Sequence, residues 1–456
     1  MNKIRKYHLI GIGGIGMSGI ARLMRARGMA VSGSDVRQSR STDELASLGC
    51  RICIGHSASN LGDADEVIYS SAIKEDNPEM REARRRGVPV RKRAEALAEL
   101  MGDKKVITVA GAHGKTTTSS LVSHMLITAG LSPTIAVGGI LKNIGNNVRE
   151  GDGDFFVAEA DESDGTFLCY RPTYSIITNI DREHLDYYKD FPSLLEAFGR
   201  FIQQTEPKGC LFCGQDQNLV KLMASCRGRS MIFGFSPELD IYASSLRFKG
   251  LTSEFDCYRK GEFLARFKLS LGGSHNVSNS LAVIALGMEL GIGIGTIGQA
   301  LATYQGAGRR LDVKLRTDKW TVVDDYGHHP TEIRATLNAL SQVESGRRIV
   351  VFQPHRYTRT KLLLDEFSGC FAQADHVIIT DIYAASEPPI EGITGEFLAG
   401  KVRAASPGKT VEYVPRDRLR AHVLGLVRPK DLVATMGAGD ITKVSDEIAE
   451  ELKKQG

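Results

Sequence analysis

A glycine-rich loop with a lysine and three threonines is the first segment of this sequence that could do chemistry. Gly111–Thr118 (GAHGKTTT) follows the apolar run Val106–Ala110 and precedes a helical pattern over Thr116–Ala129. Backbone N–H groups of such a loop can cradle phosphates, while the lysine can neutralise phosphate charge and the first threonine can ligate Mg²⁺. The loop is shorter than GxxxxGK[ST], because position 109 is Val. Its strand–turn–helix setting still predicts ATP binding by Gly111, Ala112, His113, Gly114, Lys115, Thr116 and Thr117.

A second glycine loop lies near the start of the chain. Gly11–Gly16 matches GxGxxG between a strand-like run, Tyr7–Ile12, and a helical pattern, Gly16–Ala26. Glycines there permit a tight turn and the close approach of a pyrophosphate to the helix, and Asp35 follows at the spacing of a ribose contact. Alone, this loop would indicate a nicotinamide dehydrogenase. Such an enzyme has no need of a triphosphate loop, so the two loops together predict sites for two different nucleotides.

Carboxylates and an imidazole follow two further strand-like runs. Glu159–Asp164 contains four acids directly after Phe155–Ala158, and His184 lies in Thr178–Asp186. Carboxylates at a strand end, in the same unit as a phosphate loop, are well placed to hold Mg²⁺, and a neutral imidazole can join them. These acids could also simply solvate a loop or cap a helix.

Cations and histidines gather in the last third of the sequence. Gly306–Asp312 puts Arg309 and Arg310 on a turn, and arginine suits bidentate phosphate contacts. Asp324–Pro330 (DDYGHHP) combines acids and histidines, which would also allow a metal cluster. Gln353–Thr360 (QPHRYTRT) follows a strand, and its arginines could pair with a carboxylate or an acyl phosphate.

Strand-like and helical runs alternate along the whole chain, which predicts an α/β fold. We expect three consecutive domains: a Rossmann-like domain over 1–103, a central P-loop ATPase-like domain with a mixed sheet over 104–312, and a C-terminal Rossmann-like domain over 313–456. Alternation of polar and apolar residues over 241–271 predicts antiparallel hairpins within the central domain.

The composition excludes several classes of protein. The chain has 456 residues with 58 basic and 54 acidic side chains, a net charge of +4 that argues against a mainly electrostatic nucleic-acid or membrane binder. No apolar run approaches the roughly 20 residues that span a bilayer, and no signal-peptide pattern opens the chain, so we expect a cytoplasmic protein. The sequence does not decide between a monomer and a homodimer. The CxxC pairs Cys50/Cys53 and Cys210/Cys213 fit buried thiols better than a zinc site.

Taken in order, the motifs resemble those of the Mur ligase family, the ATP-dependent amide-forming enzymes of peptidoglycan precursor synthesis. The resemblance covers essentially the whole chain and rests on nine segments: Gly11–Gly19, Gly111–Thr118, Glu159–Asp164, Thr178–Asp186, Ser274–Asn279, Gly306–Asp312, Asp324–Glu332, Gln353–Thr360 and Met436–Asp440. It implies an enzyme of the alanine-adding branch, which joins L-alanine to the carboxylate of UDP-N-acetylmuramate through an acyl phosphate. The cofactors implied are ATP and Mg²⁺, with Mn²⁺ as a substitute.

The resemblance also implies roles for individual residues. The metal ligands would be Thr116, Glu159 and His184, and the catalytic residues Lys115, His184, His355 and Arg356. ATP would further contact Asn276, Arg310 and Asp325, and the amino acid would contact Tyr326, His328, Arg356 and Arg359. The UDP-sugar would contact Gly13, Gly14, Ile15, Gly16, Ser34, Asp35, His56, Ser70 and Ser71. Several relatives carry a carbamylated lysine after the histidine; Ala197–Arg200 contains none here, so ligands of a second metal stay open.

Three other interpretations stay open. A recycling ligase would attach a pre-made peptide to the same sugar nucleotide. A nicotinamide oxidoreductase would use Gly11–Gly16 and leave Lys115 idle. A non-enzymatic, nucleotide-gated binding protein would leave Glu159, His184 and Arg356 unexplained. The base that deprotonates the amine is likewise open among His355, His328 and Asp325.

Overall fold

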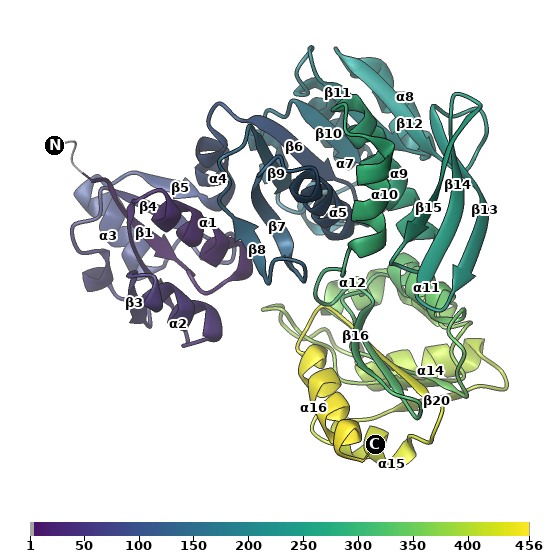
Figure 1. The fold of residues 1–456 in the computed structure, drawn as a ribbon. Helices are drawn as coiled ribbons and strands as arrows, with labels where there is room; N and C mark the ends of the chain where they lie inside the picture. The colour runs from purple at the N-terminus through teal and green to yellow at the C-terminus, as the bar shows by residue number, and fades with distance from the viewer. Residues whose placement is uncertain (1–3, 456) are drawn as a thin grey trace. The chain divides into compact units, whose positions relative to one another are not determined.

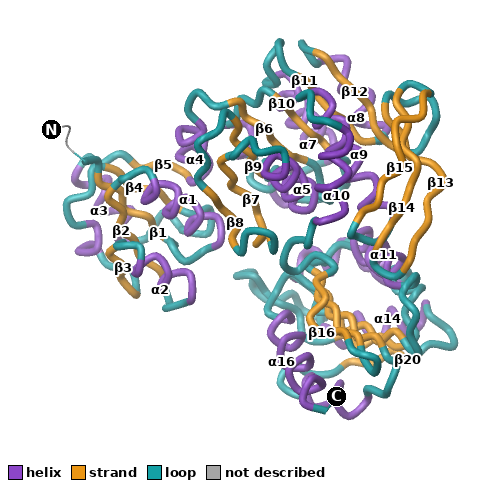
Figure 2. The backbone as a smooth tube through the Cα atoms, in the orientation of Figure 1, coloured by secondary structure: helices purple, strands orange, loops and turns teal. Residues whose placement is uncertain are grey.

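The computed structural model describes residues 4–455, and within that range the strands form three sheets of five, ten and six strands (Figure 1). The predicted α/β class with three sheet domains is confirmed. By compactness the chain divides into two units. The first comprises 1–244, 256–267 and 278–304, and the second comprises 245–255, 268–277 and 305–456. Figure 2 shows that helices accompany each group of strands.

The N-terminal sheet is parallel in the order β3-β2-β1-β4-β5. Its elements are β1 (Lys6–Ile10), α1 (Ile15–Ala26), β2 (Ala30–Asp35), α2 (Arg40–Ser47), β3 (Arg51–Ile54), η1 (Ala58–Leu61), β4 (Glu66–Tyr69), α3 (Pro78–Arg86), β5 (Val90–Lys92) and α4 (Arg93–Met101). The order reverses between β1 and β4, which opens a crevice at the carboxyl ends of the strands.

The central sheet is mixed, as expected, in the order β15-β14-β13-β12-β11-β10-β6-β9-β7-β8. Its elements are β6 (Lys105–Ala110), α5 (Lys115–Thr128), β7 (Thr134–Leu141), β8 (Asn146–Arg149), β9 (Phe155–Glu159), η2 (Thr166–Cys169), β10 (Tyr174–Ile177), α6 (Leu185–Tyr188), α7 (Phe191–Gln203), β11 (Cys210–Gly214), α8 (Gln217–Leu222), η3 (Met223–Ser225), β12 (Arg229–Gly234), β13 (Ile241–Lys249), β14 (Thr252–Arg259), β15 (Glu262–Leu269), α9 (Ser274–Glu289) and α10 (Ile294–Thr303). Two-residue turns join β13, β14 and β15, which only antiparallel neighbours allow.

The C-terminal sheet has the order β16-β17-β21-β18-β19-β20, and only its edge pair β16–β17 is antiparallel among the described strands. Its elements are β16 (Asp312–Arg316), β17 (Thr321–Asp325), α11 (Pro330–Leu340), β18 (Arg348–Phe352), α12 (Tyr357–Leu362), α13 (Leu364–Ser368), β19 (His376–Ile379), α14 (Gly395–Ala405), β20 (Thr410–Tyr413), α15 (Leu419–Leu426), β21 (Leu432–Met436) and α16 (Ile441–Lys454).

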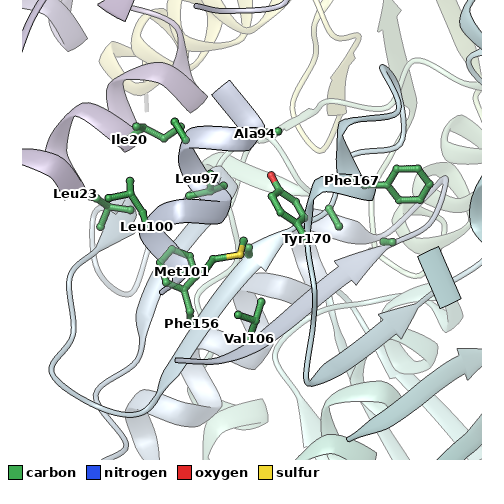
Figure 3. Packing of buried hydrophobic residues seen from close by; sticks show 14 of the residues in the cluster. Ile20, Leu23, Ala94, Leu97, Leu100, Met101, Val106, Phe156, Phe167 and Tyr170 are labelled. Atoms are coloured by element: carbon green, nitrogen blue, oxygen red, sulfur yellow. The ribbon is translucent and has the colours of Figure 1, made fainter. Parts of the chain in front are cut away.

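One apolar core joins the N-terminal and central sheets of the first unit. Figure 3 shows Leu23 of α1 and Leu100 and Met101 of α4 beside Val106 of β6 and Phe156 of β9, all of them buried. Burying a large apolar side chain contributes about 1.5–3 kcal/mol, so these contacts stabilise the first unit. No helix within residues 4–455 is long and apolar enough to cross a membrane.

Candidate active site

The first glycine loop lies where a parallel sheet commonly binds nucleotides. It follows β1, borders the crevice between β1 and β4, and leads into α1, whose N-cap is Gly14 and whose first residues are Ile15 and Gly16. A helix N-terminus of this kind attracts phosphate. The Gly13 N–H donates to Asp35 Oδ2 at 2.9 Å, which brings two predicted sugar-nucleotide contacts together.

A guanidinium that we did not predict also lies beside this loop. A Cβ added to Gly16 would lie 3.0 Å from Nη1 of Arg93, the first residue of α4. Arg93 therefore brings positive charge to the N-terminus of α1, where a diphosphate would sit. Its place follows from the packing of α4 against α1, which no local sequence pattern signals.

The remaining predicted sugar-nucleotide residues lie at different depths. His56 follows β3 with 17% of its side chain exposed. Ser70 is half-buried and Ser71 is exposed after β4. Ser34 is fully buried, and its hydroxyl donates to Glu79 Oε2 at 2.6 Å. Ser34 is thus bonded within the protein, and its direct contact with a sugar nucleotide stays a prediction.

The second glycine loop lies between the strands that lead to the predicted metal ligands. It follows β6, whose neighbours in the sheet are β9 and β10. Gly111 and Gly114 have φ of +122° and +86°, and a Cβ at these positions would lie 2.3 Å from Thr178 Oγ1 and 2.6 Å from Asn279 Oδ1. Both positions therefore require glycine.

Thr178 and Asn179 hold this loop from the end of β10. Asn179 Oδ1 accepts from the His113 N–H at 2.9 Å, and Asn179 Nδ2 donates to the His113 carbonyl at 3.0 Å. The Thr178 hydroxyl donates to the same carbonyl at 2.6 Å, and His113 Nε2 lies 2.8 Å from Asp181 Oδ2. In the sequence we singled out Thr178–Asp186 only for His184. The motif in that segment was the available signal for Thr178 and Asn179, the two residues that fix the loop.

Lys115, the first residue of α5, is enclosed by acceptors. Its ammonium group donates to the carbonyls of Gly111 at 2.6 Å and Ala112 at 3.2 Å and to Glu162 Oε1 at 3.0 Å. Burial alone would lower the pKa of Lys115, but Glu162, Asp161 and other nearby carboxylates raise it, so the ammonium stays charged. A bound phosphate would meet a fixed positive charge.

Two groups of potential metal ligands lie near this lysine. The Thr116 hydroxyl donates to Glu159 Oε1 at 3.2 Å, and the other Glu159 oxygen accepts from the Gly138 N–H at 3.0 Å. His184 is grouped with Asp161 and Glu162, whose ligand atoms lie within 4.8 Å of one another. The second oxygen of Glu162 is buried without a hydrogen-bond partner, so a cation would satisfy it. Oxygen donors with one imidazole suit Mg²⁺ and add Asp161 and Glu162 to the predicted ligands.

In the second unit, two arginines flank a tyrosine ring. The guanidinium carbons of Arg309 and Arg310 lie 4.8 and 4.9 Å from the centroid of the Tyr326 ring. Arg309 donates to the Gly437 carbonyl at 2.5 Å, whereas Arg310 Nη1 donates to Glu332 Oε1 at 3.3 Å. Because Arg309 is bound to the backbone, Arg310 is the better candidate for a phosphate contact.

Two predicted ATP contacts in this unit are buried and bonded within the protein. Asp325 is 6% exposed, and its oxygens accept from the N–H groups of Leu311 at 2.8 Å and Gly327 at 2.7 Å. Burial raises the pKa of Asp325 to about 6. Its carboxylate holds the backbone beside the arginine turn, and its contact with ATP stays a prediction. Asn276 is also buried and donates to the Gly272 carbonyl at 2.8 Å.

Four of the predicted amino-acid and catalytic residues come together around His355. Its ring stacks on Tyr383 at 5.7 Å between centroids and packs against His328 at 5.6 Å, and His328 packs against Tyr326 at 5.4 Å. Arg359 Nη1 donates to His355 Nδ1 at 3.2 Å. Burial, and then the nearby positive charges, lower the pKa of His355 to about 3, so its ring is neutral.

Arg356 has a left-handed backbone, with φ of +69°, immediately before α12. Glu387, which we did not predict, accepts from the Thr358 N–H at 3.1 Å and from its hydroxyl at 2.7 Å, and lies 3.9 Å from the Arg356 guanidinium. Glu387 thereby holds the turn that displays Arg356. It lies in the loop after β19, too far along the sequence for spacing to reveal the contact.

Two alternative metal sites find no support in the described residues. The acids and histidines of Asp324–Pro330 form no ligand group among themselves, and His329 caps α11 by accepting from the Thr331 N–H at 3.3 Å. The CxxC pairs join no such group either within residues 4–455: three of these thiols are buried and Cys53 is half-buried, as predicted.

The chain resembles known proteins over nearly its full length. Residues 6–105 match the catalytic domain of the Mur ligase family, 109–287 match the Mur ligase middle domain, and 309–439 match the family's glutamate ligase domain. A UDP-N-acetylmuramate–L-alanine ligase of Syntrophus aciditrophicus (strain SB) is 47% identical over 99% of this chain and 94% of its own length. A ligase of the same name from Geobacter sulfurreducens is 46% identical over 99% of this chain and 98% of its own length.

A solved structure agrees with these matches. The UDP-N-acetylmuramate-alanine ligase of Thermotoga maritima superposes with a TM-score of 0.85 at 30% identity, covering 99% of this chain and all of that one (100%). Because the matches extend across all three sheets and both glycine loops, the chain belongs to the Mur ligase family.

Proposed function

We propose that this protein joins L-alanine to the carboxylate of UDP-N-acetylmuramate, coupled to the conversion of ATP to ADP and phosphate. The observation that carries the proposal is the identity of 44–47% over nearly the whole chain with ligases of that name. The paired loops support it, because a ligase of this kind needs one nucleotide site for its sugar substrate and another for ATP. A nicotinamide oxidoreductase would leave Lys115, which is held among acceptors, without a role.

The first step activates the sugar carboxylate. A carboxylate oxygen attacks the γ-phosphorus of ATP, the bond to ADP breaks, and an acyl phosphate forms. Lys115 stabilises the charge on the transferred phosphoryl group, and the backbone of Gly111–Gly114 cradles the phosphates. Asn179 and Thr178 keep that backbone in place. Arg310 supplies a further cation toward phosphate.

Mg²⁺ bound by Thr116, Glu159, Asp161, Glu162 and His184, or by some of them, would neutralise phosphate charge. Glu162 currently accepts from Lys115. When a phosphate takes over the ammonium group, this carboxylate becomes available for another cation.

The second step forms the amide. The neutral amine of L-alanine attacks the acyl carbon, a tetrahedral oxyanion forms, and phosphate leaves with one former carboxylate oxygen. Arg356 and Arg359 pair with the alanine carboxylate and with the developing charge, and Tyr326 and His328 contact the amino acid.

Two of the three candidate bases fit poorly. His355 accepts from Arg359 through Nδ1 and has a pKa lowered to about 3, so its ring binds a proton weakly. Both oxygens of Asp325 accept backbone hydrogen bonds. His328 donates from Nδ1 to the Tyr326 carbonyl at 3.0 Å in its neutral form, which leaves the lone pair on Nε2, and we therefore favour His328.

Phosphate release with purified protein, ATP and Mg²⁺ tests the proposal. We expect release to require UDP-N-acetylmuramate and to be fastest with L-alanine among single amino acids, with the ligated product seen by mass spectrometry. If L-alanine fails but an alanine-led tripeptide works, the protein is a recycling ligase. If the protein is folded and binds ATP but releases no phosphate with either L-alanine or the tripeptide, it is not a ligase of this kind.

A further inference from the structure

A fully buried glutamate lies beneath the sugar-nucleotide crevice and has no role in the chemistry above. Glu79 is in the first turn of α3 and is 0% exposed. An isolated carboxylate at such a depth would be costly, so donors must surround it. Five donors do so, from β1, β2, the loop after β3 and η1: His8 Nε2 (2.9 Å), Ser34 Oγ (2.6 Å), His56 Nδ1 (3.2 Å), Ser57 N (3.2 Å) and Asn60 Nδ2 (2.9 Å).

These donors keep the carboxylate ionised. Burial by itself would raise the pKa of Glu79, but the hydrogen bonds from His8, Ser34 and Asn60 outweigh it and lower the pKa to about 2. At any pH near neutrality Glu79 can therefore only accept hydrogen bonds.

An acceptor-only carboxylate fixes the hydrogen positions of its neighbours. Ser34 must donate to Glu79, which turns an oxygen lone pair toward His56 Nδ1, 3.1 Å away. His56 Nδ1 therefore faces two acceptors, Glu79 Oε1 and Ser34 Oγ, and must carry the proton. In the neutral ring the lone pair is then on Nε2.

We propose that Glu79 is a positioning residue for the sugar-nucleotide site: it holds the His56 ring in the Nδ1–H tautomer and in one orientation, directly and through Ser34. Nε2 then accepts a hydrogen bond from an N–H or O–H group of the nucleotide, such as the uracil imide or a ribose hydroxyl. The inference rests on the proposed function, because it assumes that this crevice takes a uridine diphosphate sugar.

Calorimetric titration with UDP-N-acetylmuramate, without ATP or alanine, measures the Kd of the sugar-nucleotide site alone. We expect Glu79→Gln to raise the Kd at least tenfold, and to leave the KM for ATP and the kcat at saturating sugar nucleotide within about twofold of wild type.

Glu66→Gln is the matched control. Glu66 is also 0% exposed and lies on β4 of the N-terminal sheet, which also contains the Glu79 donors on β1 and β2, but its partners are Arg5 (2.6 Å) and Arg91. The control should lower stability and leave the Kd unchanged.

A double-mutant cycle separates positioning from a loss of folding. If Glu79 acts through His56, Glu79→Gln adds little to the loss of affinity in a His56→Ala background. Ser34→Ala, which keeps the Glu79 carboxylate, should weaken binding of the sugar nucleotide less than Glu79→Gln does. If Glu79→Gln does not fold, Ser34→Ala is used in its place. Nitrogen-15 spectra of the histidine rings, with His56→Ala for assignment, should show the Nδ1–H tautomer of His56 in wild type and its loss in Glu79→Gln.

Unchanged affinity in Glu79→Gln and Ser34→Ala, fully additive losses in the cycle, or a His56 tautomer that does not respond to Glu79→Gln would each overturn the inference. A wild-type protein that fails to bind UDP-N-acetylmuramate would contradict the proposed function, and the tautomer measurement would still decide whether Glu79 orients His56.

Discussion

The two glycine loops of the first unit share a backbone plan and differ in the side chains around them. Each follows a parallel strand and leads into a helix whose N-cap is a glycine, Gly14 or Gly114. The central loop leads into a half-buried lysine, Lys115, that faces carboxylates. The N-terminal loop contains no lysine; Arg93 lies beside it and Asp35 accepts from its backbone.

This difference indicates that the loop sets where phosphates lie, whereas the neighbouring strands decide what happens to them. Lys115 and the acids after β9 form a site that can stabilise the negative charge of a phosphoryl group during its transfer. The network of Glu79 and His56 fixes hydrogen-bonding directions, which suits a substrate that is held while its distant carboxylate reacts.

The largest expected effect comes from Lys115→Ala. Removing the enclosed cation should lower kcat by about 10³-fold, because a preorganised charge is lost where negative charge develops. Affinity for UDP-N-acetylmuramate, measured by calorimetry, should stay unchanged because that site lies at the other loop. Turnover close to wild type would refute the assignment of the central loop.

Acid titration of stability probes the N-terminal network. The pKa of Glu79 is lowered from 4.5 to about 2, so its stabilising contribution is present above about pH 4.5 and is lost as the pH falls toward 2. Between pH 5 and 2 the free energy of unfolding should fall by roughly 3 kcal/mol more in wild type than in Glu79→Gln. Parallel pH profiles, measured by denaturant titration, would show that Glu79 is not held ionised by its donors.

Arg93→Ala should weaken the binding of the sugar nucleotide by about tenfold or somewhat more, since it removes a charge-assisted contact to the diphosphate. The Kd for ATP should not change. Arg84→Ala, an exposed arginine on α3 of the same domain, is the control and should leave both constants as they are. An equal loss in both variants would mean that net charge, not position, matters.

A pair of glycine substitutions gives the smallest effects. Gly114→Ala forces a side chain into φ of +86° against Asn279 and should cost at least about 1–2 kcal/mol of stability. Gly14→Ala has φ of −64° and meets only the Gly11 carbonyl at 3.5 Å, so its stability should stay within about 0.5 kcal/mol of wild type. Thermal unfolding of both variants measures their losses of stability. Equal losses would show that the two loops do not differ in their need for glycine at the N-cap.

Local patterns were enough to predict both loops and the sheet class. The motif order placed Lys115, Thr116 and Glu159 near strand ends, and the helix predicted over Thr116–Ala129 is α5. Hairpins over 241–271 followed from alternation. The domain boundaries and the roles of the site residues stay predictions.

Contacts set by tertiary packing could not be predicted. Glu79, Arg93 and Glu387 act on residues far along the chain, and nothing in their own surroundings distinguishes them from ordinary surface charges. The protein partners of Ser34 and Asp325 were hidden for a related reason. Sequence shows that a polar residue follows a strand, not whether its oxygen faces a ligand or a buried partner, so the direct ligand contacts of both residues stay predictions.

Oxygen-18 transfer tests the central claim, activation of the sugar carboxylate by ATP, most directly. UDP-N-acetylmuramate labelled in both carboxylate oxygens is incubated with the protein, ATP, Mg²⁺ and L-alanine, and phosphate and product are analysed by mass spectrometry. The account predicts one labelled oxygen in each phosphate released and the other in the amide carbonyl. Unlabelled phosphate, released while the amide forms, would contradict it.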